Sequence, residues 1–419
     1  MPIVFVHGVN NRESDAAYIS TREKIRQNLS SFILPVIGEV GSESIYFPYW
    51  GDEGVKLRFN NISLPHPDSL LDLAGLGQLY GPYTALGPDK IEDEKLELLA
   101  IEAECYFAKA VSATESISPC KSASIGSRIN LASISCEYGV RYAIGVIFDS
   151  AGLIAKSDGE VKDLAETYKR LQIWLTANPA PAWAMNAKTN EEFLAGLRKQ
   201  IKDLENPNDK VDSLGGFSNI GLRLKESFSR LVSTRSADLT RMLMPLRPNS
   251  HLHAVRFLGD IFVYLKEREK SNQLGPIPRI VVRDFDKARA KGGQLIVVAH
   301  SLGGVITHDI LSHFRPDIEV DVLITVGSQV AVFEEMSLYA KPSENLPQLQ
   351  QLDKPNNVKK WINVFDTNDV FSFLVGGVFS DVKDFLYSTG YGGGGAHGGY
   401  FERFTFYDAL ARRVREALA

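Results

Sequence analysis

The two ends of the chain alternate between short buried-strand patterns and amphipathic helical patterns. The run PIVFVHG at 2–8 is typical of a buried strand, and 14–32 carries apolar residues at helical spacing. The same patterns predict strands at 44–52, 295–299, 321–328, 361–366 and 385–390, and helices at 277–290, from 305 onward and at 406–418. This alternation predicts an α/β fold with a mostly parallel, doubly wound sheet of about six strands.

The middle of the chain lacks strand signals and shows helical periodicity instead. Segments 95–110 and 162–175 are examples, and Thr189 with Glu192 forms a capping-box pattern at the start of another helix. We therefore expect residues 1–59 and 275–419 to form one discontinuous core. Residues 60–274 are expected to be a helical insertion that acts as a cap or lid.

The stretch QLIVVAHSLGGVITHDIL at 294–311 changes from strand to helix at Ser301. Such a turn strains the backbone and needs small neighbours, which Ala299, Gly303 and Gly304 supply. Ser301 could simply cap the helix through its hydroxyl. Alternatively, it is the nucleophile of a G-x-S-x-G elbow in which Ala299 replaces the first glycine.

A nucleophilic serine needs a base and an acid, which follow it in the order serine, acid, histidine in this type of sheet. Of the eight histidines, His397 alone lies beyond the helix that leaves the elbow, within the glycine-rich run 390–399. Two acids follow the strand KKWINVF, Asp366 and Asp369, and Asp366 could equally cap the next turn.

The oxyanion formed by attack on a carbonyl needs backbone N–H donors. Leu302, the residue after the nucleophile, should give one. Val9 should give the second if the first strand lies beside the elbow, with Gly8 allowing the close approach. His7 is then expected to support this loop and not to act in catalysis.

Composition and charge exclude several other functions. The net charge is −5 and no basic arm is present at either end, which argues against nucleic-acid binding. Cys105, Cys120 and Cys136 lack the spacing of a zinc site or a disulfide framework and indicate reduced thiols. The chain starts directly with a strand pattern and has no long apolar segment, so we expect a cytoplasmic protein. The serine chemistry considered above implies no metal or organic cofactor.

The segment 221–256 is rich in arginine and also carries an apolar stripe at helical spacing. It is either a solvated helix packed on the core or a surface that contacts anionic lipid head groups. The glycine run 390–399 lacks the lysine and Ser/Thr of a phosphate-binding loop.

Several motifs together resemble the α/β-hydrolase superfamily, and in particular its lipase-like and phospholipase-like serine hydrolases. They are VFVHGV, VVAHSLGGVITHDIL, ITVGSQ, NDVFSFL and AHGGY. The resemblance implies that Asp369 is the acid, and segment 257–265 is similar to the helix before the elbow in bacterial hydrolases of this group. The chain departs from the family at Ala299, it starts at the third of eight family strands, and its insertion matches no family lid.

These observations predict a serine hydrolase that cleaves carboxylic esters, most of all lipid esters, through an acyl-enzyme on Ser301. His397 would be the base, Asp369 would orient it, and Leu302 and Val9 would hold the oxyanion. Two alternatives stay open: a catalytically silent binding or scaffold protein, and a membrane-degrading toxic or defence effector that requires activation. The head group, acyl-chain length and oligomeric state are not indicated.

Overall fold

The computed structural model describes residues 1–38, 41–57, 96, 99–100, 103, 129–131, 134, 136–155, 157–204, 218–233, 247–271, 273–341, 351–391 and 394–419. Its centre is a six-stranded sheet in the order β2-β1-β5-β6-β7-β8, in which every pairing is parallel. The strands are β1 (Ile3–Val6), β2 (Ile45–Tyr46), β5 (Ile296–His300), β6 (Val320–Val326), β7 (Val358–Phe365) and β8 (Val382–Leu386). The predicted α/β class with a mostly parallel sheet is therefore confirmed.

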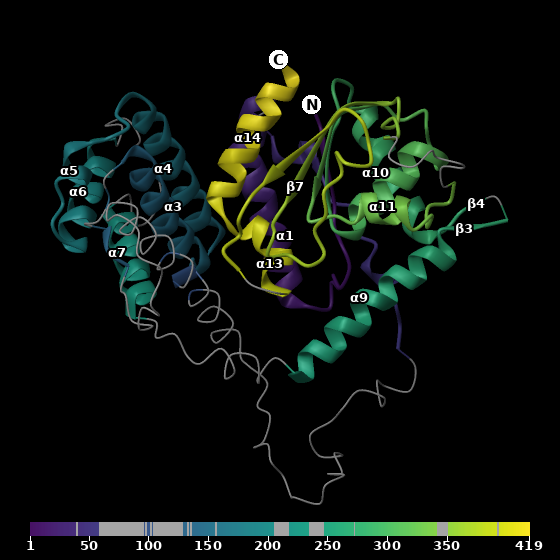
Figure 1. Cartoon of the computed structure of the whole chain (residues 1–419), viewed down its shortest axis with the longest axis horizontal. Coiled ribbons are helices and arrows are strands. Elements are labelled where there is room, and N and C mark those ends of the chain that lie inside the picture. Colours follow the sequence, from purple (N-terminus) through teal and green to yellow (C-terminus); the bar gives the residue numbers. More distant parts are fainter. Residues whose placement is uncertain are drawn as a thin grey trace, which may run out of the picture.

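Helices cover both faces of the sheet, because successive strand residues point to opposite faces. Ile3 and Phe5 of β1 belong to one hydrophobic cluster, whereas Val4 and Val6 belong to another. The first face is covered by α1 (Ala16–Asn28) and α14 (Phe404–Leu418). The second carries α10 (Pro276–Ala290), α11 (Leu302–Asp309) and α12 (Val330–Glu335). Figure 1 shows α14 and α10 on opposite sides of the strands.

Most helices of the middle region stand beside α14, on the side away from the sheet (Figure 1). They are α3 (Glu137–Leu153), α4 (Asp158–Ala177), α5 (Ala182–Met185), α6 (Asn190–Asp203) and α7 (Ser218–Ser233). Their apolar faces join the cluster of α1 and α14, so this region continues the core of the sheet. The last helix of the region, α9 (Arg247–Glu267), packs instead with the second cluster, through Tyr264.

Several element boundaries differ from the sequence prediction. The helix predicted at 14–32 ends as α1 at Asn28 and continues as a π-helical turn, Leu29–Ile33. The strand predicted at 44–52 is only Ile45–Tyr46, and the last strand is Val382–Leu386 where 385–390 was predicted.

Other local structure was predicted in part. The helix predicted at 95–110 lies mostly outside the described residues, and the one at 162–175 lies within α4. Thr189 caps α6 by accepting the Glu192 N–H at 3.1 Å, and the Glu192 carboxylate reaches back to the Lys188 N–H. A short hairpin of β3 (Glu269–Lys270) and β4 (Gln273–Leu274) had no predicted counterpart. The other short helical segments are Leu34–Ile37, Ser42–Ser44, Gly51–Glu53, Ile310–Phe314, α13 (Gly394–Gly399) and Tyr400–Glu402.

Candidate active site

Ser301 stands in a strained turn between β5 and α11. Its backbone has φ 54° and ψ −130°, a region that non-glycine residues rarely occupy. A Cβ on Gly303 would lie 2.3 Å from the Val6 carbonyl oxygen, and one on Gly304 would lie 2.2 Å from Ser328 Oγ. Only glycine therefore lets the helix start this close to β1 and β6. The Ser301 hydroxyl does not cap α11, so the simple capping interpretation is wrong.

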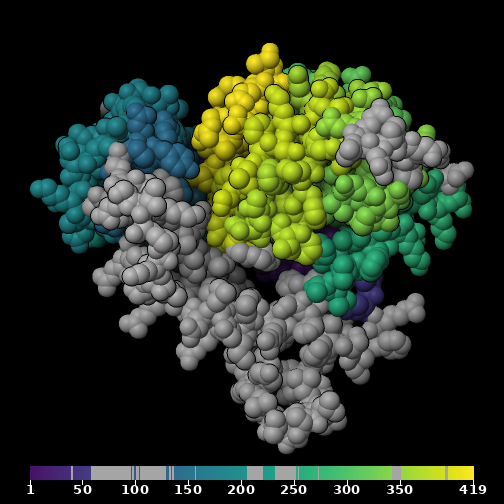
Figure 2. All heavy atoms as spheres, in the orientation of Figure 1, coloured from purple at the N-terminus to yellow at the C-terminus, as the bar shows by residue number. Residues whose placement is uncertain are grey.

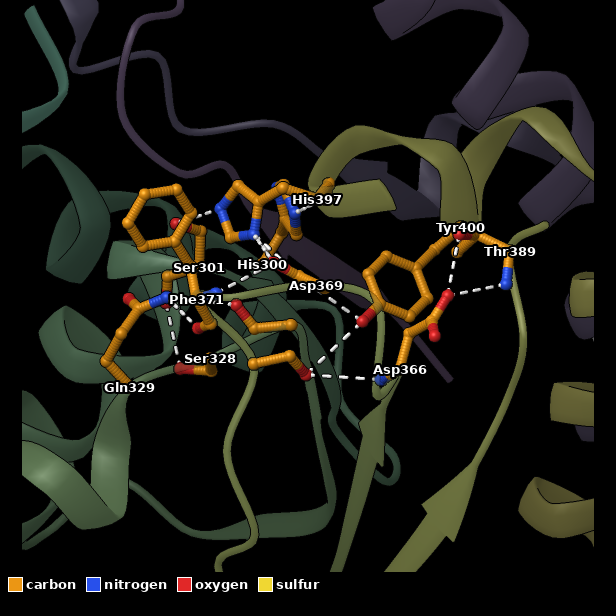
Figure 3. A network of polar contacts seen from close by, with 12 residues as sticks. His300, Ser301, Ser328, Gln329, Asp366, Asp369, Phe371, Thr389, His397 and Tyr400 are labelled. Atoms are coloured by element: carbon orange, nitrogen blue, oxygen red, sulfur yellow. Dashed lines mark hydrogen bonds and ion pairs between the residues drawn. The ribbon is translucent and has the colours of Figure 1, made fainter. Parts of the chain in front are cut away.

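The Ser301 hydroxyl instead begins a hydrogen-bonded chain of three side chains (Figure 3). His397 Nε2 lies 2.8 Å from Ser301 Oγ, and His397 Nδ1 lies 2.9 Å from Asp369 Oδ2. Because an ionised carboxylate only accepts, the neutral ring carries its proton on Nδ1. Nε2 is then free to accept the serine proton, which is the arrangement that general-base activation of a serine requires.

The two candidate acids have different partners. Asp369 accepts from His397, from the Phe371 N–H at 2.9 Å and from the Tyr400 hydroxyl at 3.1 Å. Asp366 accepts from the Asn368 N–H at 2.9 Å and from both the N–H and the hydroxyl of Thr389 at 2.7 Å. Asp366 thus caps the turn after β7 and ties it to the segment after β8. The structure brings Asp369, and not Asp366, to the histidine.

The loop after β1 lies directly against the serine. Val6 of β1 pairs with Ala299 of β5, which makes these strands neighbours. A Cβ on Gly8 would lie 2.6 Å from the Ser301 Cβ, so only glycine allows this approach. Val9 follows at once, and Leu302 begins α11 on the other side of the serine. The backbones of both predicted oxyanion donors therefore adjoin the nucleophile.

The orientation of the Val9 N–H is set by hydrogen bonds to the other end of its peptide unit. The Gly8 carbonyl oxygen accepts from His7 Nδ1 at 2.8 Å and from Asn11 Nδ2 at 2.9 Å. In a planar trans peptide the following N–H points the opposite way. These two side chains thus hold the Val9 N–H in one direction.

His7 is fixed in turn by Trp50. The Trp50 N–H donates to His7 Nε2 at 3.2 Å, which leaves the proton on Nδ1, and the two rings stack at 4.6 Å. Burial lowers the pKa of His7 to about 4. The structure therefore places His7 as a support of the loop, as expected from the sequence.

Three side chains to which the sequence analysis gave no role surround the His397 ring. Phe371 lies edge-on at 5.4 Å between ring centroids, and Phe257 of α9 lies at 6.0 Å. His300 Nε2 donates to the His397 carbonyl oxygen at 2.7 Å, and burial lowers the pKa of His300 to about 3. The position of His300 next to the serine was the one available signal. Phe257 opens the segment 257–265 that resembles a family helix, but the resemblance gave this residue no role in the site.

Exposed apolar side chains gather on the two elements that carry Phe371 and Phe257, whose rings lie 4.2 Å apart. On the loop after β7, which carries Asp369, these are Val370 and Leu374, and on α9 they are Leu258 and Phe262. Figure 2 shows the blue-green atoms of α9 beside the yellow-green surface of the C-terminal part. The two elements that carry Phe371 and Phe257 thus also expose apolar side chains, whereas Ser301 itself is 0% exposed.

The basic stretch predicted at 221–256 lies partly in α7. The apolar stripe of α7, which includes Leu224 and Phe228, is buried, and Arg223 forms an ion pair with Glu160 at 2.8 Å. This part is therefore a packed amphipathic helix. Arg235 and Arg241 lie outside the described residues, and contact with anionic lipid stays a prediction.

Of the three cysteines, Cys136 is an exposed free thiol whose sulfur accepts the Gly139 N–H, and Cys105 and Cys120 lie outside the described residues. Within the described ranges, no group of three or more His, Cys, Asp or Glu side chains is placed to hold a metal ion. A search of the same part of the chain for a helix with the length and apolarity to cross a bilayer finds none. Comparisons with known protein families, curated proteins and solved structures found no match.

Proposed function

We propose that this chain is a serine hydrolase of the α/β-hydrolase type that cleaves carboxylic esters of apolar acids. The observation that carries the proposal is the chain from Ser301 through His397 to Asp369, with the serine in a strained strand-to-helix turn. The sheet supports it, because six parallel strands are what a family sheet without its first two strands would contain. A serine that serves only the fold would need neither a strained backbone nor hydrogen-bond contact with a histidine that is itself bonded to a carboxylate.

In the proposed reaction, Ser301 Oγ attacks the ester carbonyl while His397 Nε2 takes the hydroxyl proton. Asp369 holds the ring in the required tautomer and stabilises the imidazolium ion that forms. The N–H groups of Leu302 and Val9 donate to the oxyanion. His397 then protonates the leaving alcohol. In the second half of the reaction His397 activates water, which hydrolyses the acyl-enzyme and restores Ser301.

The preference for apolar esters rests on the surroundings of the histidine. Phe257 and Phe371 lie against its ring, and the two elements that carry them also expose apolar side chains. Such a surface gains free energy by covering hydrocarbon, whereas it offers few partners to a peptide backbone. We therefore infer lipid-like esters as the substrate class, with lipase, phospholipase and carboxylesterase chemistry all compatible with the site.

Labelling with a fluorophosphonate probe tests the proposal. The wild-type chain should form an adduct that mass spectrometry locates on Ser301, and Ser301→Ala should form none. Ser312→Ala is the matched control, since Ser312 is an exposed serine that follows the same helix, and it should label like the wild type. A folded wild-type protein without an adduct, and without turnover on a panel of short and long esters, would favour the catalytically silent alternative.

A further inference from the structure

Asp260 of α9 is a buried carboxylate that binds the loop after β1. It is 0% exposed, and its oxygens accept from the Asn10 N–H at 2.8 Å and from the Val55 N–H at 2.8 Å. Arg12 donates to both oxygens, at 3.1 and 2.6 Å. Four N–H groups thus converge on one carboxylate, which offsets the cost of burying its charge.

This carboxylate acts on the peptide unit that follows Val9. Asn10 has φ 62°, a left-handed conformation that a side chain rarely adopts, and Asp260 holds its N–H directly. The Val9 carbonyl oxygen at the other end of this peptide accepts from Asn11 Nδ2 at 3.2 Å. The peptide before Val9 is already fixed through the Gly8 carbonyl oxygen, so Val9 is held on both sides.

We propose that Asp260 is a positioning residue for the second oxyanion donor, so that the middle region of the chain completes the active site. The inference rests on the proposed hydrolase function, and it goes beyond the role of a cap. Without the carboxylate, the Asn10 N–H loses its acceptor, and the Arg12 guanidinium keeps the main-chain oxygens of Asn11 and Val55 but loses its charged partner. Asn10 then loses the hydrogen bond that fixes the peptide after Val9, and the Val9 N–H is held from one side only, through the Gly8 carbonyl oxygen, so its aim at the oxyanion becomes less exact.

A second buried carboxylate, Asp309, contacts the other end of α9 and provides a matched control. Asp309, the last residue of α11, is 0% exposed and accepts from Tyr264 of α9 at 2.7 Å and from Arg268 at 3.1 Å. It therefore also joins the C-terminal end of α9 to the core, through Tyr264 and through Arg268 just after the helix, but at the end of α11 away from Ser301. Loss of either carboxylate should weaken the packing of α9, but only the loss of Asp260 should alter the oxyanion site.

The experiment compares Asp260→Asn with Asp309→Asn in the full chain, with steady-state kinetics on a soluble ester and thermal unfolding of each. An oxyanion donor acts in the transition state and not on the bound substrate, so Asp260→Asn should lower kcat about tenfold or more and leave KM within about twofold. Affinity for a trifluoromethyl ketone, which forms a tetrahedral adduct on Ser301, should fall by a similar factor. Asp309→Asn should lower the Tm about as much as Asp260→Asn does and should keep kcat within about twofold of the wild-type value.

Equal losses of kcat in the two variants, in step with their Tm values, would overturn the inference and leave Asp260 a structural tie. Wild-type kinetics for Asp260→Asn would also overturn it, as would a loss confined to KM. If the proposed function is wrong, the wild-type chain itself will form no phosphonate adduct on Ser301. That outcome is distinct from the ones above, and it overturns the inference about Asp260 as well.

Discussion

At the scale of single residues, the proposed mechanism depends on hydrogen bonds that decide where one proton lies. The Asp369 carboxylate accepts from His397 Nδ1, which leaves Nε2 free for the serine. Asp366 lies three residues earlier and has three N–H and O–H donors of its own, so it has no part in setting this tautomer.

We expect Asp369→Asn to lower kcat about 10⁴-fold, because an amide can present its N–H to the histidine and favour the wrong tautomer. Asp366→Asn should keep kcat within about threefold and destabilise the fold by about 1–3 kcal/mol, since buried donors at Thr389 lose a charged acceptor. Steady-state kinetics and denaturant unfolding of both variants provide the measurement. A large loss of kcat in the second variant with little in the first would assign the acid to Asp366.

His300 has a separate effect on the same base. Its Nε2–H holds the main-chain carbonyl of His397 at 2.7 Å, and its ring is buried. His300→Phe keeps an aromatic ring and removes the donor, so we expect kcat to fall about tenfold, the equivalent of about 1.4 kcal/mol for one lost hydrogen bond. His300→Gln keeps an N–H donor and should recover most of this loss in the same assay. Equal activity of the two variants would show that the hydrogen bond does not position His397.

The sequence made the serine, the histidine and both acids visible because local chemistry and chain order restrict them. Ser301 lies between a β-branched run and small residues, and His397 is the one histidine after the elbow helix. The supporting contacts were not visible, because Phe257 and Asp260 approach from a helix whose position depends on tertiary packing. No spacing rule relates Asp260 to Asn10, which lies 250 residues earlier.

At the scale of elements, α9 contributes in two ways to the site. Its Asp260 binds the loop after β1, and its Phe257 contacts both Phe371 and the His397 ring. A movement of the whole helix away from the site would release the Asp260 contacts. Since Ser301 is 0% exposed and Phe257 lies against the His397 ring, we expect this phenylalanine to limit access to the serine.

Phe257→Ala should therefore speed phosphonate labelling of Ser301, by about tenfold or less, because it removes cover without touching a hydrogen bond of the site. Phe262→Ala is the control, since Phe262 lies on the same helix and is 64% exposed. Labelling rates measured at several probe concentrations separate access from reactivity. If the Phe257 variant labelled no faster than the control, entry would follow another route.

The elements themselves were predictable where their patterns were long and consistent. The buried strands β5, β6 and β7 and the helices α10 and α14 follow the sequence pattern closely. The short strand β2 and the π-helical end of α1 were not predicted, because tertiary contacts decide where a weak strand or a helix ends.

At the scale of the whole molecule, the middle region and the sheet share one hydrophobic cluster, and polar contacts join them as well. Asp149 of α3 is buried, accepts the Phe404 N–H at the start of α14 and pairs with Arg403. Arg403 also donates to the Thr389 carbonyl oxygen, next to the segment that Asp366 holds. The sequence predicted the helices of this region, but a local pattern cannot show which surface they cover.

Buried histidines should make the stability of this shared core depend on pH. Burial lowers the pKa of His308, whose ring lies among Tyr339, Trp361 and Phe379, to about 3, and it acts in the same direction on His7 and His300. Below pH of about 6.5 the unfolded chain takes up protons at these rings and the folded chain does not. Stability is therefore complete at pH 7 and is lost as the pH falls toward the folded pKa values.

His308→Phe isolates one of these contributions, because the ring is replaced by one that cannot titrate in the same aromatic surroundings. Each buried histidine should lower the free energy of unfolding by about 2 kcal/mol between pH 7 and pH 5. The free energy of unfolding of the variant should therefore fall by about 2 kcal/mol less than that of the wild type over that interval. Burial raises the pKa of Asp149 and Asp309, which opposes the trend, but this effect is common to both proteins and cancels in the difference. Free energies of unfolding from urea titrations at the two pH values give the comparison. Parallel pH dependence of the two proteins would mean that His308 is protonated, or reaches water, in the folded state.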